Sequence, residues 1–120
     1  MAKALLFNIT GDKQKKLHFL CMQYGIAVLE GTVADQACPL SKLLDRGGQG
    51  SQSTLDAPFM DEMLVLHELS SQQFHGLLNG MQAIQAPVTY KAVTTNHNLS
   101  WTPSHLYREL VAEHEALQNR

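Results

Sequence analysis

The stretch Leu5-Leu6-Phe7-Asn8-Ile9, followed at once by Thr10-Gly11-Asp12, decides the fold of this chain. A short apolar run closed by turn residues predicts a buried strand. Between residues 12 and 24 the apolar side chains recur at helical intervals, which predicts a helix that ends at Gly25. Ile26-Ala27-Val28-Leu29 then predicts a second strand. The chain therefore opens with a strand, a helix and a strand.

A second strand–helix–strand segment begins at Met63-Leu64-Val65-Leu66, another apolar run. Ser70 and Gln73 have the spacing of a capping box, and the apolar residues after them again follow a helical period. The β-branched segment 88–95 predicts a fourth strand. Thr102-Pro103 has the residue types that open a helix, so a third helix is expected at the end of the chain. Its apolar stripe is expected from Leu106, Leu110, Val111 and Leu117.

The middle of the chain is less regular. Residues 39–44, with a proline at the start, predict a short helical turn. The segment from about 45 to 58 offers little to bury and is expected to be a flexible loop. Its Gly47-Gly48-Gln49-Gly50 run lacks the lysine and the spacing of a phosphate-binding loop.

This order of elements predicts an α+β fold, namely a four-stranded, split βαβ (ferredoxin-like) sheet with an added C-terminal helix. In that arrangement the first and third strands are central and the second and fourth are edges. Lys91 in the fourth strand fits, because lysine is common on edge strands. A small doubly wound α/β sheet, with residues 39–44 as an extra crossover, is the alternative.

Both faces of the central strands are apolar, because neighbouring residues of a strand point to opposite sides. Two helices cover only one face of a split βαβ sheet, so the third helix or a second subunit has to cover the other. A homodimer is therefore expected unless the third helix is the cover. The expected second-face residues are Leu6, Leu64 and Leu66, with Leu106 and Leu110 as the cover within the chain.

The composition excludes several classes of protein. One domain over residues 1–120 is expected, since the chain has the usual length of a single domain and a hydrophobic fraction of 44%. A net charge of −2 provides no basic excess for nucleic acid. No apolar run is long enough for a membrane span or a signal peptide. Because Cys21 and Cys38 form no recognised motif, a reduced, cytoplasmic protein is predicted.

The sequence contains no catalytic, metal or cofactor motif. Its six histidines include no H-x-x-x-H pair, and no cysteine–histidine cluster has the spacing of a zinc site. No G-x-S-x-G elbow marks a nucleophile. We therefore predict no catalytic residues, no metal and no cofactor.

The most unusual segment runs from Thr94 to Pro103, between a strand end and a helix start, and contains the only tryptophan. Backbone amides at a helix start can bind an anion, which makes the segment a candidate ligand site. In the alternative, its asparagines satisfy turn geometry and its tryptophan packs under the helix. The candidate ligand-binding residues are Thr95, Asn96, His97, Asn98 and Trp101.

Three runs carry a resemblance to a known family: Pro58 to Val65, Lys91 to Trp101, and Glu109 to His114. The Lys-Ala-Val-x-Thr-x-x-Asn-x-x-Trp pattern in the second run is unusual. Together the three runs resemble a family of small bacterial proteins catalogued only as a domain of unknown function. The resemblance implies a bacterial, cytosolic domain. The family has no assigned activity, substrate or cofactor, so the resemblance adds no mechanism.

The leading prediction of function is a non-enzymatic binding or regulatory module that acts as a homodimer, with an unknown small-molecule or protein partner. It uses the segment 95–101 or an exposed sheet face. The alternative is a small enzyme whose site lies where strand ends converge. In a doubly wound sheet four polar residues meet at one edge. In a split βαβ sheet Asp12 and Glu30 lie at one end, and His67 and His97 lie at the other.

Overall fold

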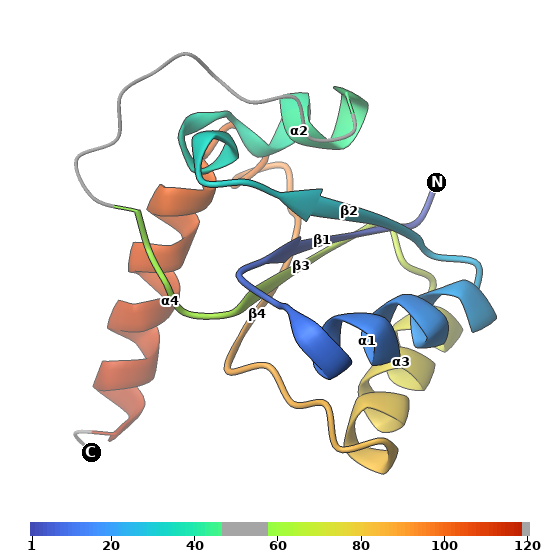
Figure 1. Ribbon diagram of the computed structural model, residues 1–120. Helices are drawn as coiled ribbons and strands as arrows, with labels where there is room; N and C mark the ends of the chain where they lie inside the picture. The colour runs from blue at the N-terminus through green and yellow to red at the C-terminus, as the bar shows by residue number, and fades with distance from the viewer. Residues whose placement is uncertain (47–57, 119–120) are drawn as a thin grey trace.

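The computed structural model describes residues 1–46 and 58–118, which form helices around one sheet (Figure 1). All elements except η1 are expected from the sequence to within a few residues. The loop expected between about 45 and 58 begins inside α2, and its residues 47–57 lie outside the described residues. In chain order the elements are β1 (Lys3–Phe7), α1 (Gly11–Gln23), β2 (Ala27–Gly31), the 3₁₀ helix η1 (Ala34–Ala37), α2 (Leu40–Arg46), β3 (Met63–His67), α3 (Ser71–Ala83), β4 (Tyr90–Val93) and α4 (Pro103–Gln118).

The sheet has the strand order β2-β1-β3-β4. β1 runs parallel to β2 and β3 runs parallel to β4, whereas the central strands β1 and β3 are antiparallel. The carboxyl ends of β1 and β2 therefore lie at one end of the sheet. Those of β3 and β4 lie at the opposite end.

The α+β class and the central position of the first and third strands are confirmed. The split βαβ, ferredoxin-like arrangement differs from the observed sheet. In a split unit another strand separates the two parallel strands, but here β1 bonds directly to β2 and β3 to β4. A doubly wound parallel sheet is not formed either, because the central pair is antiparallel.

Helices cover both faces of the sheet. In Figure 1, α1 and α3 lie side by side on one face, and α2 and α4 pack on the other. Leu6, Leu64 and Leu66 belong to the core beneath α1 and α3. The expectation that these residues form the face covered by the C-terminal helix is wrong, because a period of two separates the faces without saying which helices lie on each. The core beneath α2 and α4 contains Leu5, Phe7, Met63, Val65 and Leu106.

The covered faces change the argument for a dimer. Leu5, Leu6, Leu64 and Val65, from the two faces of the central strands, are all buried within one chain. The exposed sheet face that the sequence suggests as a binding surface does not exist among the described residues. A second subunit is therefore not needed to cover a sheet face.

The two halves of the chain repeat the same structure. Residue 3 corresponds to residue 63, so that β1 aligns with β3 and α1 with α3 over their whole lengths. Asn8 and Glu68, directly after the two strands, both have a positive φ, 61° and 56°. Gly25 and Gln85, after the two helices, also have positive φ, and the next residue in each half donates a 2.9 Å hydrogen bond back into its helix.

The correspondence continues after the second strand of each half. Thr32 and Asp35 follow β2 as Thr95 and Asn98 follow β4. In both turns the threonine N–H donates to the side-chain oxygen of the later residue at 2.8 Å. The N–H of that residue donates back to the threonine Oγ1, at 3.3 Å in the first turn and 3.1 Å in the second. α2 and α4 then begin at the equivalent positions 40 and 103.

The fold is thus two βαβα units related by a pseudo-twofold axis. Leu5 of β1 is paired with Val65 of β3, which is its own counterpart in the repeat. The axis passes between these two residues. Each unit has one buried strand at the axis and one strand at an edge of the sheet.

Cys21 and Cys38 are both free and buried. Cys21 lies in the core beneath α1, as expected, and burial raises its pKa to about 11. Among the helices of the described residues, none is long and apolar enough to cross a membrane.

The capping box of α3 generates a first prediction. The Ser70 hydroxyl accepts from the Gln73 N–H at 3.1 Å, and the Gln73 side chain accepts from the Ser70 N–H at 2.9 Å. We expect Ser70→Ala to lower the free energy of unfolding by about 1 kcal/mol, because the helix loses a cap. The measurement is urea denaturation, with Ser71→Ala as the control. An equal effect of the two substitutions would contradict the role of the box.

Candidate functional site

Two of the five candidate residues, Thr95 and Asn98, hold the turn after β4. The Thr95 Oγ1 accepts from the N–H groups of His97 and Asn98, and the Asn98 Oδ1 accepts from the Thr95 N–H. The Asn98 amide also donates to the Val93 carbonyl at 3.2 Å. Because Thr32 and Asp35 make the same pair of bonds in the other half, the arrangement belongs to the scaffold of the fold.

Trp101 anchors the start of α4. It packs against the core beneath α2 and α4, and its carbonyl accepts a hydrogen bond from the Leu40 N–H at 2.9 Å. Its ring is stacked on His105, with centroids 4.2 Å apart, while the ring of His97 approaches it edge-on at 5.4 Å. The tryptophan is therefore half-buried against protein, as the packing alternative expects.

A concave surface lies beside this turn, at the carboxyl ends of β3 and β4. Its volume is about 450 Å³, and we call it the β3–β4 depression. Thr95 and Asn96 line it, but His97, Asn98 and Trp101 do not. The start of α3 forms another wall. The lining residues are 66–71, 74, 93–96 and 99.

A chain of polar side chains crosses the depression. The Nδ1 of His67 lies 2.8 Å from the Thr94 Oγ1, and the Nε2 of His67 lies 3.2 Å from a carboxylate oxygen of Glu68. The same carboxylate accepts from the N-terminal ammonium of Met1 at 3.0 Å. That hydrogen bond and the ammonium charge, with the charge of His67, lower the pKa of Glu68. His67 is thereby held between a hydroxyl and a carboxylate.

The other half of the chain shows what the scaffold requires at this place. Phe7 and Gly31 pair across the strands where His67 and Thr94 meet in the second unit. A Cβ atom on Gly31 would lie 2.1 Å from the Phe7 ring, so the ring occupies the space above the glycine. In the first unit, the fold is therefore satisfied by an apolar pair, Phe7 over Gly31, that leaves no space between the side chains. In the second unit, the polar pair His67 and Thr94 lines the depression.

The position of Glu68 differs between the halves in the same way. Its counterpart Asn8 donates its side-chain amide to the carbonyls of Phe59 and Asp61, at 2.9 and 3.0 Å. These hydrogen bonds hold the segment before β3 against the end of β1 in the first unit. The corresponding end of β3 in the second unit borders the β3–β4 depression.

The four residues of the enzymatic alternative do not meet. Asp12 and Glu30 follow or end the strands of the first unit, whereas His67 and His97 lie with the second unit at the opposite end of the sheet. Glu30 is engaged by Gln14 and by His18, whose Nε2 is 3.1 Å from the carboxylate. The polar residues that do converge are at the β3–β4 end.

A second polar feature is the contact between Tyr107 of α4 and Asp61. The Tyr107 hydroxyl donates to the Asp61 carboxylate, which raises the pKa of Tyr107 to about 12. Its ring is stacked on Phe59 with centroids 4.5 Å apart. These contacts fix the segment before β3 on α4, so their role is structural.

Buried polar atoms and metal ligands add no further site. The Asp35 Oδ1 and the Ser104 Oγ are buried and have no hydrogen-bond partner. The other oxygen of Asp35 is bonded within its own turn. Among the histidines, cysteines and carboxylates of residues 1–46 and 58–118, no three come together in a way that could hold a metal ion.

Sequence reasoning named only part of this site. His67 entered through the enzymatic alternative. Thr94 began the candidate segment but was not named as a site residue, and Glu68 was not a candidate. A signal existed in the polar residues directly after the apolar run 63–66. Their meeting with Thr94 depends on the parallel pairing of β3 with β4, which periodicity does not fix.

The fold and the depression define a small α+β protein with two repeated units and a concave site in the second. Residues 62–117 match the family model described as Domain of unknown function (DUF3783). The resemblance to a family catalogued only as a domain of unknown function is confirmed. The matched segment is the second βαβα unit and includes every lining residue of the depression. No curated protein and no solved structure matches the chain.

Within the 95–98 turn, the Thr95 hydroxyl holds the backbone and the Asn96 side chain lines the depression. These two roles can be separated by mutation. We expect Thr95→Ala to lower the free energy of unfolding by about 1 kcal/mol, because it removes the hydroxyl that caps the turn. Asn96→Ala should change stability by less than about 0.5 kcal/mol, since this side chain is exposed. Urea denaturation of both variants is the measurement. A larger loss for Asn96→Ala would contradict the division.

Proposed function

We propose that this protein is a small cytosolic, bacterial, non-enzymatic binding module whose ligand site is the β3–β4 depression. The observation that carries the proposal is the difference between the two halves at one place in the fold. Where the first unit has Phe7 over Gly31, the second has His67 bonded to Thr94 at the rim of a hollow. Because the apolar pair is sufficient for folding, the polar pair is free to serve recognition.

The chemistry of the walls indicates a small, polar ligand with an apolar side. His67, Thr94 and Asn96 offer hydrogen-bond donors and acceptors. Phe74 and Leu99 supply apolar surface. A mixture of this kind, with few polar groups on a partly apolar wall, is typical of small-molecule sites. The hollow of about 450 Å³ is within the size range of such sites.

The test is a screen of ¹⁵N-labelled protein against hydrogen-bonding fragments by NMR. We expect chemical-shift changes to concentrate at residues 66–71 and 93–96, because these backbone segments line the depression. The paired substitution His67→Phe with Thr94→Gly gives the second unit the residues that the first unit already accommodates. It should weaken binding of the best fragment at least tenfold and leave the fold intact.

The matched control is Val33→Asn, which places the residue type of Asn96 at the equivalent, exposed position of the first unit. This variant should bind the fragment as the wild type does. Shift changes confined to other surfaces, or unchanged affinity in the paired variant, would refute the proposed site.

A second function is favoured by one observation, the hydroxyl–imidazole–carboxylate order of Thr94, His67 and Glu68. A hydroxyl within hydrogen-bond reach of a base that a third group orients is the arrangement of an activated nucleophile. In that case His67 accepts the Thr94 proton as the Thr94 oxygen bonds to an acyl carbon and the leaving group departs. Water then releases the acid.

This second function has its own test. Incubation with p-nitrophenyl acetate should release p-nitrophenolate in the wild type and leave an acetyl group on Thr94, detected by peptide mass analysis. Thr94→Val should abolish both signals, because no hydroxyl remains to form the ester. Fragment binding without any acetylation of Thr94 would leave the binding module as the function and exclude the enzyme.

The homodimer remains part of the proposed function, with a changed interface. Neither sheet face is open to a second subunit, because α1 and α3 cover one and α2 and α4 cover the other. The edges of the sheet are the remaining surfaces of the sheet itself.

A further inference from the structure

The outer surface of α1 is apolar at two positions where its counterpart α3 is polar. Phe19 and Met22 are 58% and 69% exposed. The equivalent residues of α3 are Asn79 and Gln82, which are also exposed. Because α3 shows that polar residues satisfy the same helix at these positions, the fold does not require the apolar pair. Phe19 and Met22 lie three residues apart on the helix, so their side chains are neighbours and form one apolar patch.

The sheet edge beside α1 also differs from the edge beside α3. In the repeat, Val28 of β2 corresponds to Lys91 of β4, and Pro87 stands just before β4. Lysine and proline on an edge discourage pairing with another chain. β2 carries neither residue. Its acidic residue, Glu30, is turned toward α1, where His18 and Gln14 engage the carboxylate.

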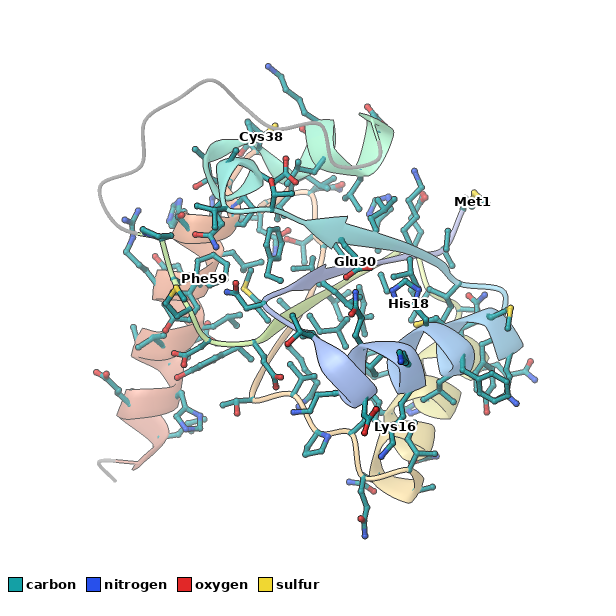
Figure 2. All side chains as sticks on the ribbon, viewed as in Figure 1. Met1, Lys16, His18, Glu30, Cys38 and Phe59 are labelled. Atoms are coloured by element: carbon teal, nitrogen blue, oxygen red, sulfur yellow. The ribbon has the colours of Figure 1, made fainter. Side chains whose placement is uncertain are left out.

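α1 and the β2 edge form one continuous, shallow groove. A depression of about 620 Å³ is lined by Phe19, Met22 and Val28 among others, and a second of about 360 Å³ continues it along Lys15 and Glu30. Figure 2 shows His18 and Glu30 pointing toward one another from α1 and β2, and Met1 near the start of β2. The open strand edge and the apolar helix surface therefore lie next to each other.

We propose that a second copy of this chain binds here, with the two β2 strands antiparallel about a twofold axis and the two α1 helices side by side. This interface rests on the homodimer of the proposed function. A strand edge is self-complementary in an antiparallel pair, since its outward N–H and C=O groups meet the same groups of the other copy. The same operation places the apolar surface of each α1 against the other. The interface is isologous and closes as a dimer.

The surface available agrees with what a dimer needs. Phe19 and Met22 together expose roughly 250 Å² of side chain per copy, on the basis of about 200 Å² for a side chain of this size. A standard interface buries about 800 Å² per partner. The two side chains thus supply about a third of that area, and the proposed interface takes the remainder from the β2 edge and the stems of Lys15 and His18, which line the same groove.

The experiment is sedimentation velocity of the full chain, beside the double variant Phe19→Asn with Met22→Gln. These substitutions give α1 the residues that α3 carries at the same positions, so folding is retained. We expect a dimer for the wild type and at least tenfold weaker self-association for the double variant. The matched control is Met60→Gln, an exposed methionine (76%) on a different surface, which should sediment as the wild type does.

Amide exchange provides the second measurement. The Ala27 N–H donates to the Ala2 carbonyl, so the N–H groups of Val28 and Glu30 point away from β1. These two amides should be protected in the wild type and exchange rapidly in the double variant. A wild type that is monomeric up to about 1 mM would overturn the proposal, since this corresponds to less than about 4 kcal/mol of association. A monomer would also contradict the homodimer of the proposed function, whereas a dimer that the double variant leaves unchanged would overturn this interface alone.

Discussion

The antiparallel pairing of β1 with β3 is the constraint on which the rest of the structure depends. Leu5 and Val65 meet at its centre, and both strands are buried on both faces. Two strands buried in this way need two layers of cover, and each unit provides one helix for each layer. α1 and α3 form the first layer, and α2 and α4 form the second. Because β1 and β3 are antiparallel, the strands of the two units end at opposite ends of the sheet. The β3–β4 depression therefore belongs to the second unit alone.

Local chemistry made much of this fold predictable. The apolar runs at 5–9 and 63–66, the capping box of Ser70 and the Thr102-Pro103 helix start all depend on neighbouring residues, and all correspond to observed elements. The sheet order was predictable only in part. Apolar central strands follow from burial, but whether a strand bonds to its own βαβ partner or to a strand between them is a long-range choice that a period of two does not encode.

The site was harder to predict for a related reason. Thr95 and Asn98 looked functional because they are polar and clustered, yet the turn after β2 uses Thr32 and Asp35 in the same way. His67 and Thr94 lie in different elements, and only the strand register brings them together. The repeat is hard to recognise in the sequence. Few residues agree between the halves, and the correspondence lies in backbone conformation and hydrogen bonds. The identical pairs include Leu6 with Leu66, Leu17 with Leu77 and Thr32 with Thr95.

The left-handed residue after each helix has a consequence for engineering this chain. Gly25 adopts φ 69° without strain, whereas Gln85 at the equivalent place adopts φ 56° with a full side chain. A left-handed conformation costs a residue with a Cβ roughly 1 kcal/mol or more relative to glycine. The first unit therefore supplies a template for Gln85→Gly, a change expected to raise the melting temperature of the protein. Gln85 follows the C-terminal end of α3, whereas the start of this helix lines the β3–β4 depression, so the stability of the protein can be increased without altering the depression.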